Sequence, residues 1–160
     1  MQNEEQNAQA AASAVLTVTI QVVGIARGNP GLAGAGIVII DGVGTMREQV
    51  ARYLGNAGAL EAQLQALTLA LRYAKPYAPA PLRLVLGNDA AVRQLGGEQP
   101  PRHPAVLRML GSIDALEAPF GGVTYHLGRD GELDEATRLA NLGIDTRLRP
   151  IPSYDRPVPP

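Results

Sequence analysis

The feature that most constrains the fold is an amphipathic helical segment followed by a short apolar run. Between Ala59 and Ala74, apolar residues recur at intervals of three and four and stop before Pro76, which predicts one long helix. Residues Leu82–Leu86 form a nearly continuous apolar run between Pro81 and Gly87, a pattern typical of a buried central strand. A long helix that leads into a buried strand indicates a crossover connection in an α/β sheet.

Three strands are predicted ahead of this helix. Residues Val15–Val23 are rich in β-branched side chains and alternate in polarity, and a second strand, Ala35–Ile40, follows a turn at Gly28–Gly31. Another turn, Asp41–Gly44, precedes Thr45–Leu54, whose pattern alone fits either a strand or a short helix. Because the turn is tight and the run is short, we interpret all three segments as a meander.

The second half of the chain predicts helices at Asp89–Leu95, Ala105–Leu116 and Asp134–Leu142, with a strand at Val123–Leu127 between the last two. The expected order of elements is therefore β-β-β-α-β-α-α-β-α. This order belongs to the α/β class and describes a mixed five-stranded sheet with helices on both faces.

The length of 160 residues suits one domain, which we expect to span residues 15–148. Residues 1–14 are mostly Gln, Asn, Glu and Ala, a composition that predicts a disordered N-terminal tail. Residues 149–160 are rich in proline and predict an extended C-terminal tail without its own core.

Composition excludes several classes of function. The chain has no cysteine and two histidines, which excludes disulfides, thiolate nucleophiles and cysteine-ligated zinc, so any metal would need carboxylate ligands. The formal net charge of −1 predicts no general attraction to nucleic acid or to anionic membranes. No apolar run reaches the roughly 18 residues of a membrane span, and Glu4 and Glu5 stand where a signal peptide carries positive charge. A cytoplasmic location is expected.

Four segments, taken together, resemble the ribonuclease H type 1 family, and the resemblance covers nearly the whole expected domain. Each is weak alone, but their spacing as a set is specific. They are the turn Gly28-Asn29-Pro30-Gly31, Glu61 near the start of the long helix, Asn88-Asp89-Ala90-Ala91-Val92-Arg93-Gln94 after the fourth strand, and Ala136-Thr137-Arg138-Leu139-Ala140-Asn141 in the last helix. The resemblance implies the RNase H-like fold.

The resemblance also implies that most of the family's catalytic acids have been replaced. The family's three aspartate positions hold Val23, Asn88 and Thr137, and Glu61 remains as a relic of the fourth acid. The family hydrolyses the RNA strand of an RNA–DNA hybrid with two Mg²⁺ ions, which require several anionic oxygen ligands. We therefore expect a catalytically degenerate domain, a pseudo-enzyme without a metal or another cofactor. Glu61 fits equally well as a first-turn residue favoured by the helix dipole.

Two further acids keep an enzymatic alternative open. A one-residue slip at the end of the fourth strand would put Asp89 in the place of Asn88, and Asp134 lies on the same helical face as Thr137. With Glu61 they would make a weak, Mg²⁺-dependent ribonuclease acting on RNA–DNA hybrids. A slip along a strand turns a side chain to the other face, however, and nothing replaces the first-strand acid, so this alternative is disfavoured.

The resemblance implies that Arg27, Gly28, Asn29 and Arg93 contact nucleic acid, although the turn residues also fit a purely structural role. The basic extra helix of some family members is absent. Binding of an RNA–DNA hybrid or of RNA is therefore expected to be weak and salt-sensitive. The alternative is a protein-interaction or scaffold module that uses the Pro-rich tail or an exposed sheet edge.

Overall fold

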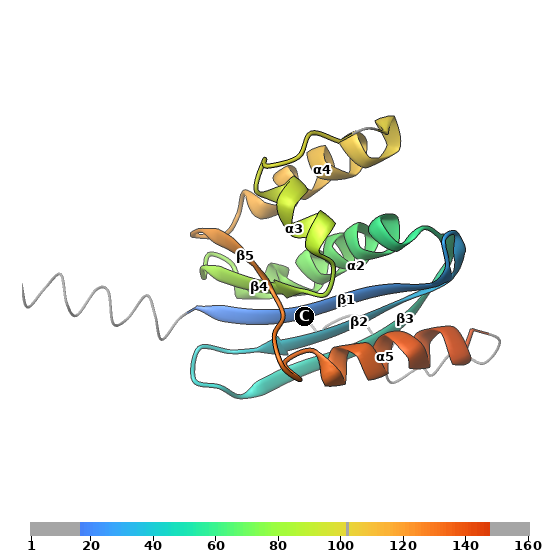
Figure 1. Ribbon diagram of the computed structural model, residues 1–160. Helices are drawn as coiled ribbons and strands as arrows, with labels where there is room; N and C mark the ends of the chain where they lie inside the picture. The colour runs from blue at the N-terminus through green and yellow to red at the C-terminus, as the bar shows by residue number, and fades with distance from the viewer. Residues whose placement is uncertain (1–16, 102, 148–160) are drawn as a thin grey trace, which may run out of the picture.

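The computed structural model describes residues 17–101 and 103–147. Both boundaries expected for the domain, residues 15 and 148, and both expected tails lie outside the described residues. The described chain forms a five-stranded sheet in the order β3-β2-β1-β4-β5, with helices on both faces (Figure 1). The expected α/β class and the expected order of elements are confirmed.

The first three strands form an antiparallel meander: β1 spans Val18–Gly28, β2 Gly31–Ile40 and β3 Met46–Ala57. The third segment is thus a strand and not a helix. β1 begins at Val18 rather than Val15 and continues past its predicted end at Val23 to Gly28, while β2 begins at Gly31 rather than Ala35. The two strands meet at Asn29-Pro30, whose peptide bond is cis. The start of β2 is rich in Gly and Ala, which have low strand propensity, so backbone pairing with β1 rather than local sequence forms this part of the sheet.

The crossover predicted from the sequence is present. Helix α2 spans Ala59–Ala74 and passes through a 3₁₀ turn at Lys75–Tyr77 into β4, Leu82–Leu86, which lies parallel to β1. Strand β5, Val123–Leu127, is parallel to β4 at one edge of the sheet. The predicted bounds of α2, β4 and β5 agree with the structure.

Three more helices complete the fold: α3 at Asp89–Leu95, α4 at Pro104–Glu117 and α5 at Asp134–Asp145. Helix α5 lies on one face of the sheet, against β2 and β3, while α2 covers the other face and α4 packs on α2 (Figure 1). No helix in the described ranges is long and apolar enough to cross a membrane.

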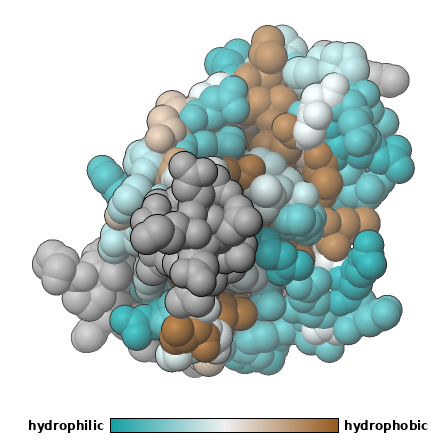
Figure 2. Space-filling view, turned by 90° about the vertical axis from the view of Figure 1, so that its left-hand side faces the viewer, coloured by the Kyte–Doolittle hydropathy of each residue, from teal (hydrophilic) through white to brown (hydrophobic). Residues whose placement is uncertain are grey.

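The sheet separates the two larger apolar cores, and a small third cluster consists of Ala33, Ala57 and Ala62. The larger core, which α2 covers, includes Ile20, Ile37, Leu64, Leu67 and Leu84. The smaller core lies under α5 and consists of Val23, Val38, Ala136, Leu139 and Ala140. Exposed large apolar side chains are spread over several elements, and Figure 2 shows apolar patches separated by hydrophilic surface on one face.

Candidate functional site

The region where the resemblance expects a catalytic centre lies where β1 and β4 run side by side. The two strands are parallel, with Val22 opposite Leu86, so Val23 and Gly87 come next along their strands. Val23 is only 4% exposed and packs in the smaller core. A Cβ atom placed on Gly87 would lie 3.6 Å from Cγ2 of Val23. An aliphatic side chain therefore occupies the position on β1 at which the resemblance expects a catalytic aspartate.

Gln63 of α2 closes this region from the other face of the sheet. Its side chain is fully buried, and its Nε2 donates to the carbonyl oxygen of Val22 at 3.0 Å. Its Oε1 accepts from the backbone N–H groups of Gly24, at 3.4 Å, and Gly87, at 3.3 Å. The neutral amide thus links β1 to β4 with both of its polar atoms bonded. An ionised carboxylate has no proton to donate to Val22, so the position suits an amide and not an acid.

Glycine at position 24 allows α2 to approach β1 this closely. A Cβ atom at Gly24 would overlap the backbone carbonyl of Ala62, the residue before Gln63. The glycine after Val23 is therefore needed for packing, independently of any chemistry at position 23.

Leu133, immediately before α5, fills the remaining space. Its Cδ1 lies 3.5 Å from where a Cβ on Gly87 would be, and a Cβ on Gly128 would overlap the same side chain. Thr137, one helical turn later, is exposed, and its N–H donates to the carbonyl oxygen of Leu133 at 2.8 Å. Val23, Gln63 and Leu133 thus form an uncharged centre beside Gly87, and we call these four residues the neutral centre.

The structure places Glu61 and Asn88 at the starts of two helices. Glu61 is exposed in the first turn of α2, and Gln63, two residues later, is the residue beside Val23. Asn88 caps α3, because its Oδ1 accepts from the N–H of Ala91 at 3.0 Å. Sequence reasoning missed Gln63 because a glutamine gives no acidic signal. Its place on the apolar face of the helix, four residues before Leu67, is the signal that could have identified it.

Asp89 and Asp134, the proposed substitutes, are not gathered around a metal site. Asp89 is exposed and forms an ion pair with Arg93 at 2.8 Å, while the carboxylate of Asp134 lies beside Gly131. Within residues 17–101 and 103–147, no group of three or more His, Asp or Glu residues could hold a metal ion. Two Mg²⁺ ions require several carboxylates between them, so the residues present do not fit the family's metals.

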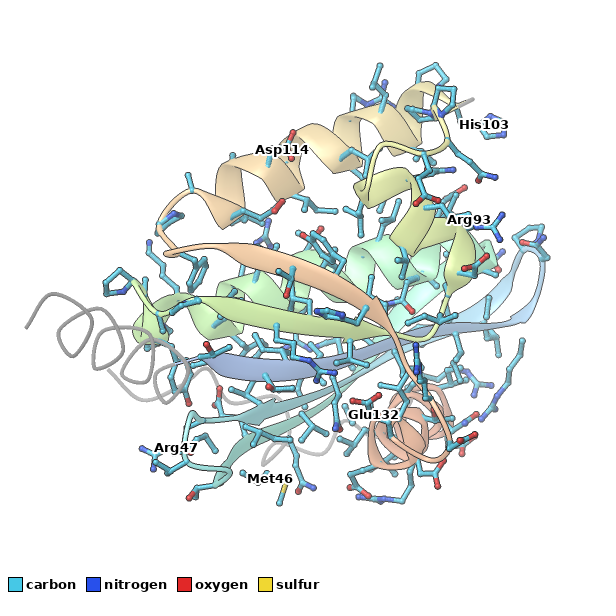
Figure 3. The ribbon with its side chains drawn as sticks, turned by 60° about the vertical axis from the view of Figure 1, so that its left-hand side comes forward. Met46, Arg47, Arg93, His103, Asp114 and Glu132 are labelled. Carbon is cyan, nitrogen blue, oxygen red and sulfur yellow. The ribbon has the colours of Figure 1, made fainter. Side chains whose placement is uncertain are left out.

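The carboxylates near α5 are engaged in surface contacts. Glu132 (labelled in Figure 3) approaches Arg83, with 3.5 Å between Oε2 and Nη1, and accepts from the backbone N–H of Arg129. Glu135 accepts from Nε2 of Gln49 at 3.0 Å, and the adjacent Arg138 lowers the pKa of its carboxyl group. These acids stabilise the fold locally and leave the neutral centre without charge.

The residues expected to bind nucleic acid already have partners within the chain. Arg27 pairs with Asp145 at 2.8 Å, and Arg93 pairs with Asp89. Oδ1 of Asn29 accepts from the N–H of Ala59 at 3.1 Å, so the turn holds the start of α2, and Gly28 has a φ of 120°. Both arginines remain about half exposed, and exposed ion pairs contribute only about 0–1 kcal/mol, so phosphate can replace the carboxylates.

The chain is similar in sequence to a known protein family and to a curated mycobacterial protein. Residues 21–143 match a family model described as reverse transcriptase-like. The bifunctional protein Rv2228c of Mycobacterium tuberculosis is 27% identical over 131 residues, which are 81% of this chain and 36% of that protein. The chain therefore spans about a third of the length of this curated relative.

Solved structures with the same fold include RNase H1 from Halobacterium salinarum, with a TM-score of 0.76, 26% identity, and coverage of 81% of this chain and 98% of that one. The N-terminal RNase H domain of Rv2228c has a TM-score of 0.76, 27% identity, and coverage of 81% and 100%. LC11-RNase H1, solved in complex with an RNA/DNA hybrid, has a TM-score of 0.76, 25% identity, and coverage of 82% and 99%. The chain belongs to the reverse transcriptase-like family and has the RNase H-like fold.

Proposed function

We propose that this domain is a catalytically silent member of the RNase H-like fold, which binds an RNA–DNA hybrid or RNA without cleaving it. The observation that carries the proposal is the buried amide of Gln63, which makes three hydrogen bonds to the backbones of β1 and of Gly87, the residue that follows β4. We infer that Gln63, and not Glu61, occupies the family's helix position. An amide, a valine and a leucine then stand where the reaction requires anionic ligands.

The neutral centre also explains how the fold tolerates the loss of its acids. Clustered carboxylates repel one another unless metal ions compensate their charge. In this chain Val23 and Leu133 add apolar packing at the same place, and Gln63 adds hydrogen bonds. The replacements therefore support a metal-independent scaffold.

Binding of nucleic acid is supported by the relatives and by the basic residues. LC11-RNase H1, which has the same fold, was solved with an RNA/DNA hybrid. The turn that precedes β2 is intact, and Arg27 and Arg93 are exposed enough to exchange their carboxylate partners for phosphates. Because the net charge is −1 and both arginines must break an ion pair, the affinity is weak and depends strongly on salt.

A labelled RNA–DNA hybrid tests this proposal directly. We expect its fluorescence anisotropy to rise with protein at low salt and to fall again as salt is added, while the hybrid stays intact with Mg²⁺ present. Arg93→Ala should weaken binding, because it removes one phosphate partner. Double-stranded DNA and double-stranded RNA of the same sequence serve as competitors.

The control for cleavage is a variant in which Glu61, Asp89 and Asp134 are all alanine. Cleavage that persists unchanged in this variant comes from a contaminating nuclease. Cleavage that copurifies with the parent protein and disappears in the variant would overturn catalytic silence and support the enzymatic alternative. Absence of binding at the lowest salt would instead overturn nucleic-acid recognition.

Divalent metal should not stabilise the protein. A ligand that binds only the folded state raises the melting temperature by mass action, and the neutral centre offers no anionic ligand. We expect the same melting temperature in EDTA and in millimolar Mg²⁺ or Mn²⁺. A rise with Mn²⁺ that disappears in Glu61→Ala would show that a metal site persists around that residue.

A further inference from the structure

A long strand, β3, forms one edge of the sheet in the described part of the chain. β3 is 12 residues long and is the terminal strand of the described sheet, next to β2 alone. Register irregularities opposite Ala33/Gly34 and Ile39/Ile40 leave Glu48–Tyr53 as its regular central part. An exposed strand edge of this kind presents backbone N–H and C=O groups that can pair with another strand.

A groove of about 500 Å³ lies beside this edge, between β3, α2 and α4. Among residues 17–101 and 103–147, the charged residues that line it are Arg52 and Arg72, both basic. Leu54, Leu69 and Met109 make its wall partly apolar. The groove is therefore complementary to a carboxylate carried on a neighbouring strand.

Glu48 lies on the same strand and on the same face as Arg52, because four residues separate them. A separation of about 13 Å along an extended strand keeps the two side chains of one chain apart. The Oε2 atom of Glu48 is buried and has no hydrogen-bond partner in the described structure, and burial raises the pKa of its carboxyl group. β3 thus contains both a carboxylate in need of a partner and a cationic groove.

We propose that β3 pairs antiparallel with the β3 of a second copy of this chain, centred on Val50, so that Glu48 of each copy lies opposite Arg52 of the other. The twofold symmetry forms this ion pair twice and extends the sheet across both copies. Each Glu48 enters at the rim of the other copy's groove, while the helices keep their places on the two faces. The proposal is independent of the proposed function, because it involves none of the residues of the neutral centre.

The charges select this register over its neighbours. In an antiparallel pair of identical strands, shifting the centre to Gln49 puts Glu48 opposite Val50, and shifting it to Ala51 puts Arg52 opposite Val50. Both shifts leave the charged side chains facing an apolar one. Only the register centred on Val50 pairs opposite charges.

Sedimentation of the full chain from micromolar to submillimolar concentrations tests the proposal. We expect a concentration-dependent species of about twice the 16.8 kDa chain mass. Glu48→Arg and Arg52→Glu each bring like charges together at both sites, so each should weaken dimerisation by about tenfold or more. The double variant with both substitutions restores opposite charges and should recover the dimer. Glu98→Arg, an equal change of charge at an exposed residue outside β3, is the matched control and should leave the dimer unchanged.

Circular dichroism accompanies each variant, because Nη2 of Arg52 also donates to the Tyr73 hydroxyl and its loss affects the fold locally. Glu48→Arg leaves that bond in place and therefore keeps the test decisive. A parent chain that remains monomeric at the highest concentration overturns the proposal. So does a dimer that resists Glu48→Arg, or a folded double variant that fails to regain the dimer.

Discussion

Replacing Gln63 by glutamate is expected to lower the free energy of unfolding at neutral pH by about 4 kcal/mol. The substitution removes the donor that bonds the carbonyl oxygen of Val22 and places a negative charge beside that oxygen. The site is fully buried, and the hydrogen-bond partners of Gln63 in the described part of the chain are backbone groups of Val22, Gly24 and Gly87, none of which carries a positive charge. Denaturation in urea measures the loss as a lower midpoint with an unchanged slope.

The loss caused by Gln63→Glu should depend on pH in a defined direction. Burial raises the pKa of the introduced carboxyl group above its value of about 4.3 in the unfolded chain. A raised folded pKa means that the stability is complete below the unfolded pKa and is lost as the pH rises through the folded pKa. Relative to the parent, the variant should therefore recover stability as the pH falls toward about 4, where the protonated carboxyl can again donate to Val22.

Gln65→Glu is the matched control, because it makes the same chemical change two residues later on α2, at a partly exposed position beside Arg72 in the groove. It should change stability by less than about 0.5 kcal/mol. Equal losses in the two variants, or a Gln63→Glu variant as stable as the parent at neutral pH, would contradict the structural role assigned to the amide.

The parts of the fold that could be predicted from the sequence are those that local patterns define. The helix Ala59–Ala74 and the strand Leu82–Leu86 could be predicted with their ends, because prolines and glycines flank the helical periodicity of the one and the apolar run of the other. The sequence does not mark where β1 ends and β2 begins, because Gly31–Gly36 has little intrinsic preference for a strand. Long-range pairing sets those ends, and long-range pairing is not visible in one local window.

The candidate site shows the same division. Val23 could be located because the Gly28–Gly31 turn fixes its distance from the hairpin, and the structure places it beside Gly87. Gln63 could not be located in this way, because the helix contains no motif residue that fixes which of its residues faces the sheet. The exposed Glu61 lies only two positions away and gives the stronger sequence signal. Which residue of a helix faces a strand depends on helix rotation, which here follows from the packing of Gly24 against Ala62.

Restoring acids around the neutral centre should create a divalent-metal site, and two variants identify which helix residue belongs to it. The triple variant Val23→Asp, Asn88→Asp and Thr137→Asp relies on the native Glu61, and the quadruple variant adds Gln63→Glu. Without metal both should be less stable than the parent, since crowded carboxylates repel one another and are costly to bury. Millimolar Mn²⁺ should recover most of that loss in the quadruple variant, because the ion binds only the folded state.

Calorimetric titration with Mn²⁺ separates the two assignments. We expect the quadruple variant to bind at least about tenfold more tightly than the triple variant, because Gln63 lies beside Val23 whereas Glu61 is exposed. Equal binding would assign the helix position to Glu61. A quadruple variant that folds without binding metal would show that position 88 is the wrong place for the acid after β4. The side chain of Asn88 points to the N-terminus of α3, whereas a Cβ on Gly87 would point toward Val23 and Gln63. Moving that aspartate to position 87 should then restore binding, at the expense of the contact that Leu133 makes there.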